Sequence, residues 1–247
     1  TGYKGGGVNP RPFNSHQILS FLPETLTTYE VGAKSDLFSN HLRVNAALFF
    51  NKYKDIILNL SDCTAQAGVG FGGPPCALPA NIGTADVKGA ELEVNWRLGG
   101  GFSVDATASV MDFQYKDTGV ATGVTTNMIT PYTPEQKYSF GMMWEGDIGS
   151  AGSLVLRGDA GYQSEVQSAA INQLVSGTTR VPGYTVVNAR ATWRSPESLW
   201  EASLEVNNVL DKLYFFGNAD WSTSAGSTTY TPAMPRNWAV TVKRNFN

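Results

Sequence analysis

Residues 90–98, AELEVNWRL, indicate the fold class, because apolar and polar side chains alternate along them without exception. Three glycines follow at 99–101, and the alternation resumes in residues 102–110, FSVDATASV. A period of two belongs to a β-strand with two unlike faces. Two such runs joined by a short glycine connection predict a β-hairpin.

The same alternation recurs along most of the chain. The further runs that show it, some less cleanly than the first two, cover residues 26–37, 43–58, 138–145, 154–162, 187–194, 200–207 and 237–246. With the first hairpin they predict about nine or ten long strands and no amphipathic helix of useful length. Arg244 is the one outlier on the apolar face of the last run.

Short and long connections alternate strictly between these runs. The short ones are residues 38–41, 99–101, 148–152 and 195–198; the long ones are residues 5–25, 59–83, 114–134, 164–182 and 210–235. An outer-membrane barrel requires this arrangement, with tight periplasmic turns at one rim and long extracellular loops at the other. We therefore expect an all-β fold, a portion of a transmembrane antiparallel up-and-down β-barrel.

Aromatic residues collect at the two ends of the expected strands. Those beside the short turns are Trp96, Phe102, Trp144, Trp193, Trp200 and Phe246; those near the opposite ends are Tyr29, Tyr53, Tyr115, Tyr138, Tyr162, Tyr184 and Trp238. Two aromatic girdles around an aliphatic band are the pattern that a bilayer selects. A soluble β-sandwich, the alternative, would scatter its aromatic residues through a core.

Charged residues share the other face of the strands. They are Glu91, Glu93, Arg97, Asp105, Arg157, Asp159, Arg190, Arg194, Glu201 and Glu205. A dry core cannot hold so many charges, whereas a wet lumen or a polar plug can. This face is therefore expected to line the inside of the barrel, with the apolar face against outer-membrane lipid.

The composition excludes several other classes of protein. A net charge of −3 argues against a broad nucleic-acid-binding surface. No apolar run approaches the roughly 18–20 residues of a membrane helix, and residues 1–7 do not resemble a signal peptide. No catalytic motif is present, so we expect neither an enzyme nor a cofactor, and the glycines at 68–73 lack the strand and helix of a dinucleotide site.

Two cysteines, Cys63 and Cys76, lie in one long connection. They lack CxxC spacing, and only His16 and His41 could add imidazole ligands, so no metal site is expected. Outside the cell a Cys63–Cys76 disulfide is the favoured interpretation, closing a loop of about 14 residues. Two buried free thiols are the alternative.

Several stretches resemble TonB-dependent outer-membrane receptors. Residues 23–56, PETLTTYEVGAKSDLFSNHLRVNAALFFNKYKDI, are similar to a characteristic two-strand segment of that family. Residues 81–96, NIGTADVKGAELEVNW, resemble its next strand, and residues 203–215, SLEVNNVLDKLYF, resemble its penultimate strand with an N-x-x-D-K-x-Y ending. Residues 235–246, PRNWAVTVKRNF, resemble the closing strand, although Phe246 is followed by Asn247.

The resemblance implies a barrel of about 22 strands with an N-terminal plug. Residues 1–247 would then be the C-terminal segment of the barrel domain, in the bacterial outer membrane, without the plug and its TonB-contacting segment. A sheet of about ten strands cannot close at that diameter and would leave open edges in lipid. The implied partners are the TonB complex, through the plug, and the barrel-assembly machinery, through the C-terminal strand.

The resemblance also implies function: a scarce solute, such as a siderophore, vitamin or saccharide, binds at extracellular loops and enters with TonB-derived energy. Long loops display binding groups on a rigid wall, and exposed aromatic residues and arginine are enriched at recognition sites. The candidate ligand-binding residues are Phe71, Arg180, Trp221 and Tyr230. The alternatives are a passive channel, such as a porin or autotransporter translocator, and a surface β-module with an adhesive role.

Overall fold

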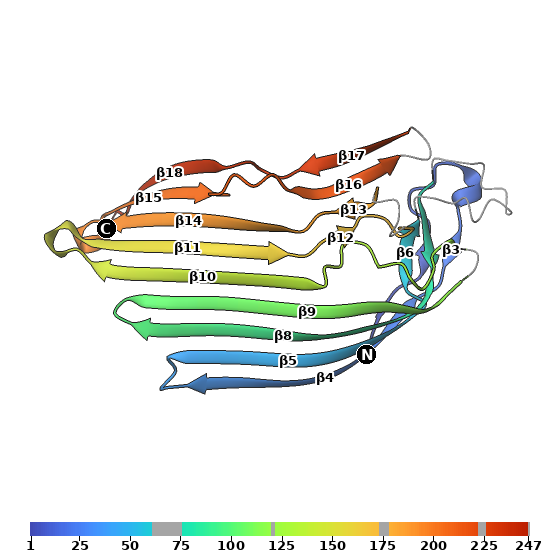
Figure 1. The fold of residues 1–247 in the computed structure, drawn as a ribbon, viewed down its shortest axis with the longest axis horizontal. Helices are drawn as coiled ribbons and strands as arrows, with labels where there is room; N and C mark the ends of the chain where they lie inside the picture. The colour runs from blue at the N-terminus through green and yellow to red at the C-terminus, as the bar shows by residue number, and fades with distance from the viewer. Residues whose placement is uncertain (61–75, 120–121, 173–177, 222–225, 247) are drawn as a thin grey trace.

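The computed structural model describes residues 1–60, 76–119, 122–172, 178–221 and 226–246. Ten strands form one antiparallel sheet, in which each long strand pairs with its neighbours along the chain (Figure 1). They are β1 (Gly2–Lys4), β4 (Glu24–Leu37), β5 (Leu42–Lys54), β8 (Gly83–Gly99), β9 (Phe102–Thr118), β10 (Gln136–Asp147), β11 (Ser153–Gln163), β14 (Tyr184–Arg194), β15 (Trp200–Asn207) and β18 (Asn237–Arg244). This order confirms the predicted up-and-down fold. Across the described ranges, no helix is long and apolar enough to span a membrane.

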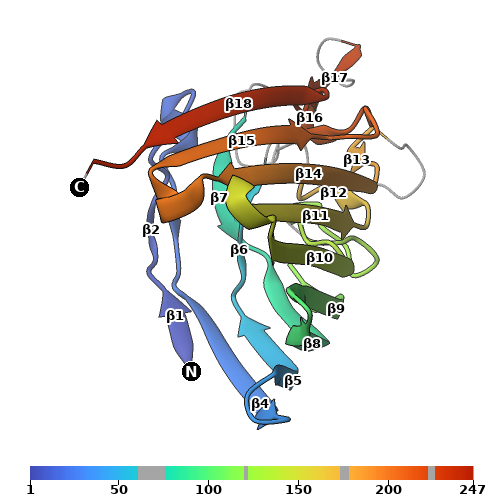
Figure 2. The same ribbon diagram turned by 90° about the vertical axis from the view of Figure 1, so that its left-hand side faces the viewer.

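The sheet is curved, with the short β1 and β18 at its two edges (Figure 2). Strand register puts the polar positions in common rows: Glu93 lies opposite Asn45 and Thr107, and Arg190 lies opposite Arg157 and Glu205. We call this concave surface the inner wall. The opposite, outer wall carries the residues predicted to face lipid: Ala90, Leu92, Val94, Ala106, Ala189, Leu204 and Val242.

The short connections lie together at one end of the sheet and the long ones at the other (Figure 1). Two of the short connections contain 3₁₀ turns, η4 (Gly149–Ala151) and η5 (Pro196–Ser198). In the β8–β9 turn, Gly101 has a φ of 84°, and a Cβ there would lie 1.9 Å from the carbonyl oxygen of Glu145. Glycine is therefore required at this position.

The aromatic girdle at the short-turn end is on the outer wall as predicted, with Trp96, Phe102, Trp193 and Trp200 exposed. At the long-loop end, Tyr29, Tyr138, Tyr162 and Trp238 also occupy outer positions. The placement of Tyr53, Tyr115 and Tyr184 in this girdle is wrong, because their register puts them on the inner wall. Tyr53 and Tyr115 pack there against the loops, and Tyr115 is 2 % exposed.

Arg244, the charged outlier of the last strand, is held between two aromatic rings. Its guanidinium carbon lies 5.2 Å from the ring centroid of Trp200 and 5.0 Å from that of Phe246. Arginine stacked on aromatic faces at the end of a strand keeps its charge near water while its stem covers apolar surface.

The long connections fold into small two-stranded sheets beyond the wall. They pair β2 (Gly7–Val8) with β3 (Ser20–Phe21), β6 (Ile57–Leu60) with β7 (Leu78–Asn81), β12 (Val166–Gln167) with β13 (Arg180–Val181), and β16 (Phe215–Trp221) with β17 (Ser227–Pro232); a 3₁₀ turn, η1 (Ser15–Gln17), lies between β2 and β3. We call these elements and their described connections the loop layer. In Figure 2, β6 and β7 lie on the concave side of the sheet.

The loop layer has its own apolar core. Leu60, Leu78 and Ile82, all less than 4 % exposed, pack with residues of three other segments in one cluster that includes Ile56, Tyr115, Val124 and Ala170. Asn81 ties the layer together, because its Nδ2 donates to the carbonyl oxygens of Leu22 (2.9 Å) and Asp55 (2.8 Å). The long connections are therefore packed structures held against the inner wall.

Candidate ligand site on the inner wall

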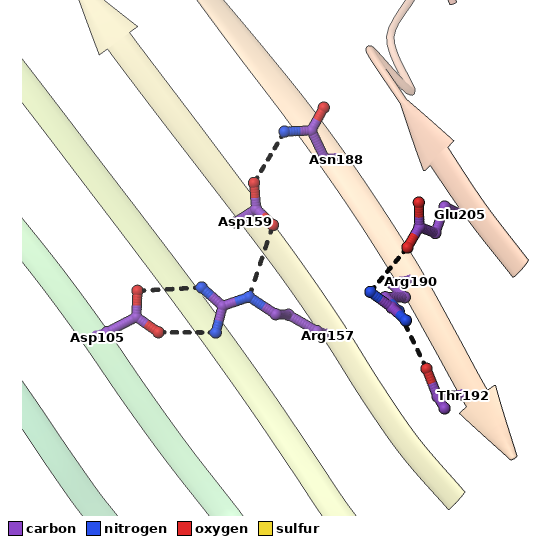
Figure 3. A network of polar contacts seen from close by, with 7 residues as sticks. All are labelled: Asp105, Arg157, Asp159, Asn188, Arg190, Thr192 and Glu205. Carbon is purple, nitrogen blue, oxygen red and sulfur yellow. Dashed lines mark hydrogen bonds and ion pairs between the residues drawn. The ribbon is translucent and has the colours of Figure 1, made fainter. Parts of the chain in front are cut away.

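Ion pairs and hydrogen bonds cross the middle of the inner wall (Figure 3). Arg157 on β11 donates two bonds to Asp105 on β9, of 2.9 and 3.2 Å, and its Nε lies 3.7 Å from Asp159. Asn188 on β14 donates to Asp159 at 2.8 Å. Arg157 reaches Asp105 across β10 because the intervening residue is Gly141, where a Cβ would lie 2.6 Å from the guanidinium.

Two further arginines complete this polar surface. Arg190 pairs with Glu205 at 2.8 Å and donates to Thr192 at 3.1 Å. Arg194 pairs with Glu145 at 3.0 Å and with Glu201 at 3.2 Å. All these charged side chains keep 30–50 % of their surface exposed, so the network is hydrated and not a buried core.

A hollow of about 530 Å³ is lined by the network residues Asp105, Arg157, Asp159 and Asn188 and extends to β16 of the loop layer. The row of lining residues at the long-loop end of the sheet is Lys137, Gln163 and Tyr184, which lie opposite one another on β10, β11 and β14. Gly161 lies in the next row, and a Cβ there would meet no atom within 4 Å. Tyr214 and Phe216 line one side. We call this hollow, lined by the four network residues and these six residues, the wall hollow.

The turn after β15 brings the aromatic side of the wall hollow into place. Asn208, with φ of 52°, accepts from the backbone N–H of Lys212 at 2.8 Å and donates to the carbonyl of Lys212 at 2.9 Å. Its backbone N–H donates to Asn188 on β14 at 3.0 Å. The chain that emerges places Tyr214 4.5 Å from Tyr184 and 5.8 Å from Phe216, between ring centroids.

The same turn connects the two sequence motifs, residues 203–215 and 235–246, that resemble segments of TonB-dependent receptors. Asp211 of the N-x-x-D-K-x-Y segment accepts from the backbone N–H of Arg236 at 3.1 Å, and the two side chains lie 3.8 Å apart. Arg236 is the second residue of the closing-strand motif. The two motifs therefore fasten the two ends of the β15–β18 connection to each other.

The structure brings Arg180 and Tyr230 together, two of the four ligand-binding residues predicted from the sequence. The Tyr230 hydroxyl donates to the carbonyl oxygen of Arg180 at 3.4 Å, and its ring lies 5.0 Å from that of Phe215. The Arg180 side chain, 57 % exposed, forms an ion pair with Glu165. The backbone of Trp221 ends β16, but its side chain, like the whole of Phe71, lies outside the described residues.

Cys76 is disulfide-bonded and 8 % exposed. Cys63 lies outside the described residues, so the Cys63–Cys76 pairing stays a prediction. Within the described ranges, no group of three or more His, Cys, Asp and Glu side chains could hold a metal ion.

The sequence did not single out Lys137, Gln163 or Gly161. Lys137 and Gln163 are isolated polar positions at strand ends, and Gly161 is one glycine among 26. Because Gln163 and Gly161 alternate with the outward-facing Tyr162, the sequence does indicate that both residues face inward. What brings these positions together is cross-strand register, which no local pattern encodes.

An apolar outer wall, a hydrated ion-paired inner wall and a packed loop layer at one rim define part of an outer-membrane β-barrel. Residues 2–209 match the family described as TonB dependent receptor-like, beta-barrel. The chain belongs to this family and to the outer membrane of Gram-negative bacteria.

Relatives and solved structures agree with this assignment. The chain is 27 % identical over 215 residues to a pesticin receptor of Yersinia enterocolitica, covering 86 % of this chain and 28 % of the relative. It is 28 % identical over 226 residues to the ferric-pyoverdine 358 receptor of Pseudomonas putida, covering 91 % and 24 %.

The crystal structure of the ferric yersiniabactin uptake receptor FyuA from Yersinia pestis shares the fold. Its TM-score is 0.80 at 21 % identity, with 100 % of this chain and 34 % of that chain covered. The chain thus spans about a quarter of the length of the curated relatives that it matches.

Proposed function

We propose that this chain is the C-terminal segment of the barrel of a receptor that binds a siderophore-type ligand at its extracellular face. The receptor imports that ligand into the periplasm with energy from the TonB complex. It acts as a transporter and catalyses no reaction. Family membership over residues 2–209 carries the proposal.

The shape of the chain supports the proposal. The ten-stranded sheet ends at β1 and β18, each with one strand neighbour in the described part of the chain. Open strand edges in lipid cost several kcal/mol for each unpaired backbone group. Further strands from the same receptor would complete the barrel, and a plug would meet the inner wall.

The ligand class is supported by the names of the relatives. One is a ferric-pyoverdine receptor, and another, from Acinetobacter baumannii, is a probable TonB-dependent siderophore receptor. The packed loop layer supplies what such a receptor needs at its mouth, which is exposed groups on a rigid base. Two further partners belong to the proposal: lipid on the outer wall, and the assembly machinery at β18.

The test is accumulation of iron-55 from a panel of ferric siderophores, in cells that express the intact receptor, with and without TonB. We expect uptake of at least one ferric siderophore only when TonB is present. The hydrated inner wall also suits a passive channel, and equal uptake in both strains would favour that alternative.

A further inference from the structure

Lysines of the outer wall gather in one sector at its long-loop end. Four of the nine lysines of the chain lie at the ends of three neighbouring strands, β5, β8 and β9: Lys52, Lys54, Lys88 and Lys116. Register gives them the outer positions, with Lys88 between Phe50 and Asp112. The corresponding outer positions on β10, β11, β14 and β18 hold Gln136, Tyr138, Tyr162, Thr185 and Trp238. We call the four lysines the lysine patch.

Carboxylates neutralise only part of the lysine patch. Lys88 pairs with Asp112 at 3.0 Å, and Lys116 pairs with Asp86 at 3.8 Å. The two lysines of β5 form no ion pair in the described part of the chain. A third carboxylate, Asp117, lies on β9, two strands away from them. Four lysines against three carboxylates leave a positive charge, and this charge is located on β5.

The orientation of Lys52 favours an anion at the membrane surface. A lysine near the end of a membrane-spanning strand ordinarily extends its ammonium group toward water. The Nζ of Lys52 instead lies 5.4 Å from the ring centroid of Phe50, which is two residues nearer the middle of the strand. Phe50 lies opposite Tyr29 of the aromatic girdle. The ammonium group is therefore at the level of the lipid headgroups, where phosphates are available to pair with it.

An apolar hollow lies beside the lysine patch, toward the middle of the strands. Its volume is about 490 Å³, and outer-wall side chains of β4, β5, β8 and β9 form most of its lining, among them Val31, Ala46, Leu48, Leu92 and Ala108. Leu48 follows Phe50 in the next outer row, so the hollow begins two residues from the patch. The two alanines leave the space, and Leu48, 59 % exposed, borders it. We call this cavity the outer hollow.

We propose that the lysine patch and the outer hollow together bind one phosphorylated glycolipid of the lipid A type. Lys52 and Lys54 pair with a phosphate, and one acyl chain lies in the outer hollow. The long loops mark the extracellular side of an outer-membrane barrel, and the extracellular leaflet of that membrane consists of such glycolipids. This inference rests on the proposed function for the lipid contact of the outer wall, and it names the lipid.

The test is native mass spectrometry of the intact receptor, purified in detergent and titrated with three lipid probes. Lipid A with both phosphates has the charge and the chains that the site requires. Dephosphorylated lipid A has the chains without the charge, and phosphatidylglycerol is anionic with one phosphate and two chains. We expect bisphosphorylated lipid A to bind at least about tenfold more tightly than either of the other probes. Equal affinity for dephosphorylated lipid A or for phosphatidylglycerol would overturn the proposal.

Charge variants locate the headgroup. The double variant Lys52→Gln/Lys54→Gln should weaken binding of bisphosphorylated lipid A by about tenfold or more. The matched control Lys34→Gln/Lys137→Gln removes two lysines from the inner wall, so binding should be unchanged. An equal loss in the control would show that net charge alone determines binding, which would contradict a site at the lysine patch.

Hollow variants locate the acyl chain. Ala46→Trp fills the outer hollow and should weaken binding of the same probe, whereas Ala189→Trp, on the outer wall of β14, should not. Heat-modifiable migration in gels verifies that each variant has assembled. Unchanged binding in both Ala46→Trp and the Lys52→Gln/Lys54→Gln variant would overturn the proposal. Iron-55 uptake by the unmodified receptor that does not require TonB would count against the proposed function, and the lipid result would still stand.

Discussion

The inner wall and the loop layer hold their residues in place by different means. On the wall, Arg157 and Arg190 are paired but remain partly exposed, and the shape comes from the backbone ladder of the sheet. In the loop layer, Leu60 and Ile82 are fully buried, and the shape comes from apolar packing. We therefore expect that removing a side chain lowers the stability of the loop layer much more than that of the inner wall.

The largest expected effect is in the core of the loop layer. Ile82→Ala removes a fully buried side chain and should lower the stability of the layer by about 2–5 kcal/mol. Hydrogen exchange of the amides in β6 and β7 should accelerate, while those of β10 and β11 stay protected. Leu213→Ala, at a position 69 % exposed, is the control, and an equal effect there would remove the distinction between the two regions.

A charge on the outer wall should cost nearly as much. Leu204→Arg places a cation against lipid and should reduce the unfolding free energy of the receptor in vesicles by about 2–4 kcal/mol if the site is near the bilayer midplane. Thr241→Arg lies beside it on the inner wall, where it meets water, and should cost far less. If Thr241→Arg proved the more damaging variant, the assignment of the two faces would be reversed.

The Asn208 turn joins the two regions, so its loss should have an intermediate effect. Asn208→Ala removes the two short side-chain bonds to Lys212 and should destabilise the protein by about 1–3 kcal/mol. It should also speed hydrogen exchange in residues 212–216, because Tyr214 is no longer held against Tyr184. Asn207→Ala, which loses one bond to Asn237, should leave this exchange unchanged. Equal acceleration in the two variants would argue against a positioning role for Asn208.

The smallest effect is expected in the ion-paired network. Arg157→Gln should cost less than about 1 kcal/mol, because the pair is partly exposed and screened by water. A double-mutant cycle with Asp105→Asn measures the pair itself. A coupling of several kcal/mol would show that the wall is dry and packed in the intact receptor, which would contradict the comparison.

Much of the fold could be predicted because its signals are local. Alternation in residues 90–98 and the glycines at 99–101 specify a hairpin without reference to distant residues. Inward charges such as Asp105 and Arg157 were predicted for the same reason. Their pairing across Gly141 was not, because it depends on the register of three strands.

The candidate site was harder to predict. Tyr53, Tyr115 and Tyr184 were assigned by their place along the strands, although strand parity turns them inward to pack on the loops and line the hollow. Arg180 and Tyr230 lie in different loops, and the docking of β13 with β16 brings them together. Such contacts arise from packing between distant segments, which composition does not encode.

One measurement tests most directly the central claim that one face of the wall meets lipid and the other meets water. Cysteine is introduced at Gly161 and, separately, at Gly158 of the intact receptor in outer membranes, and a membrane-impermeant maleimide is added. Residue 161 should be labelled, whereas residue 158 should stay unlabelled. Equal labelling of both positions, or labelling of residue 158 alone, would contradict the account.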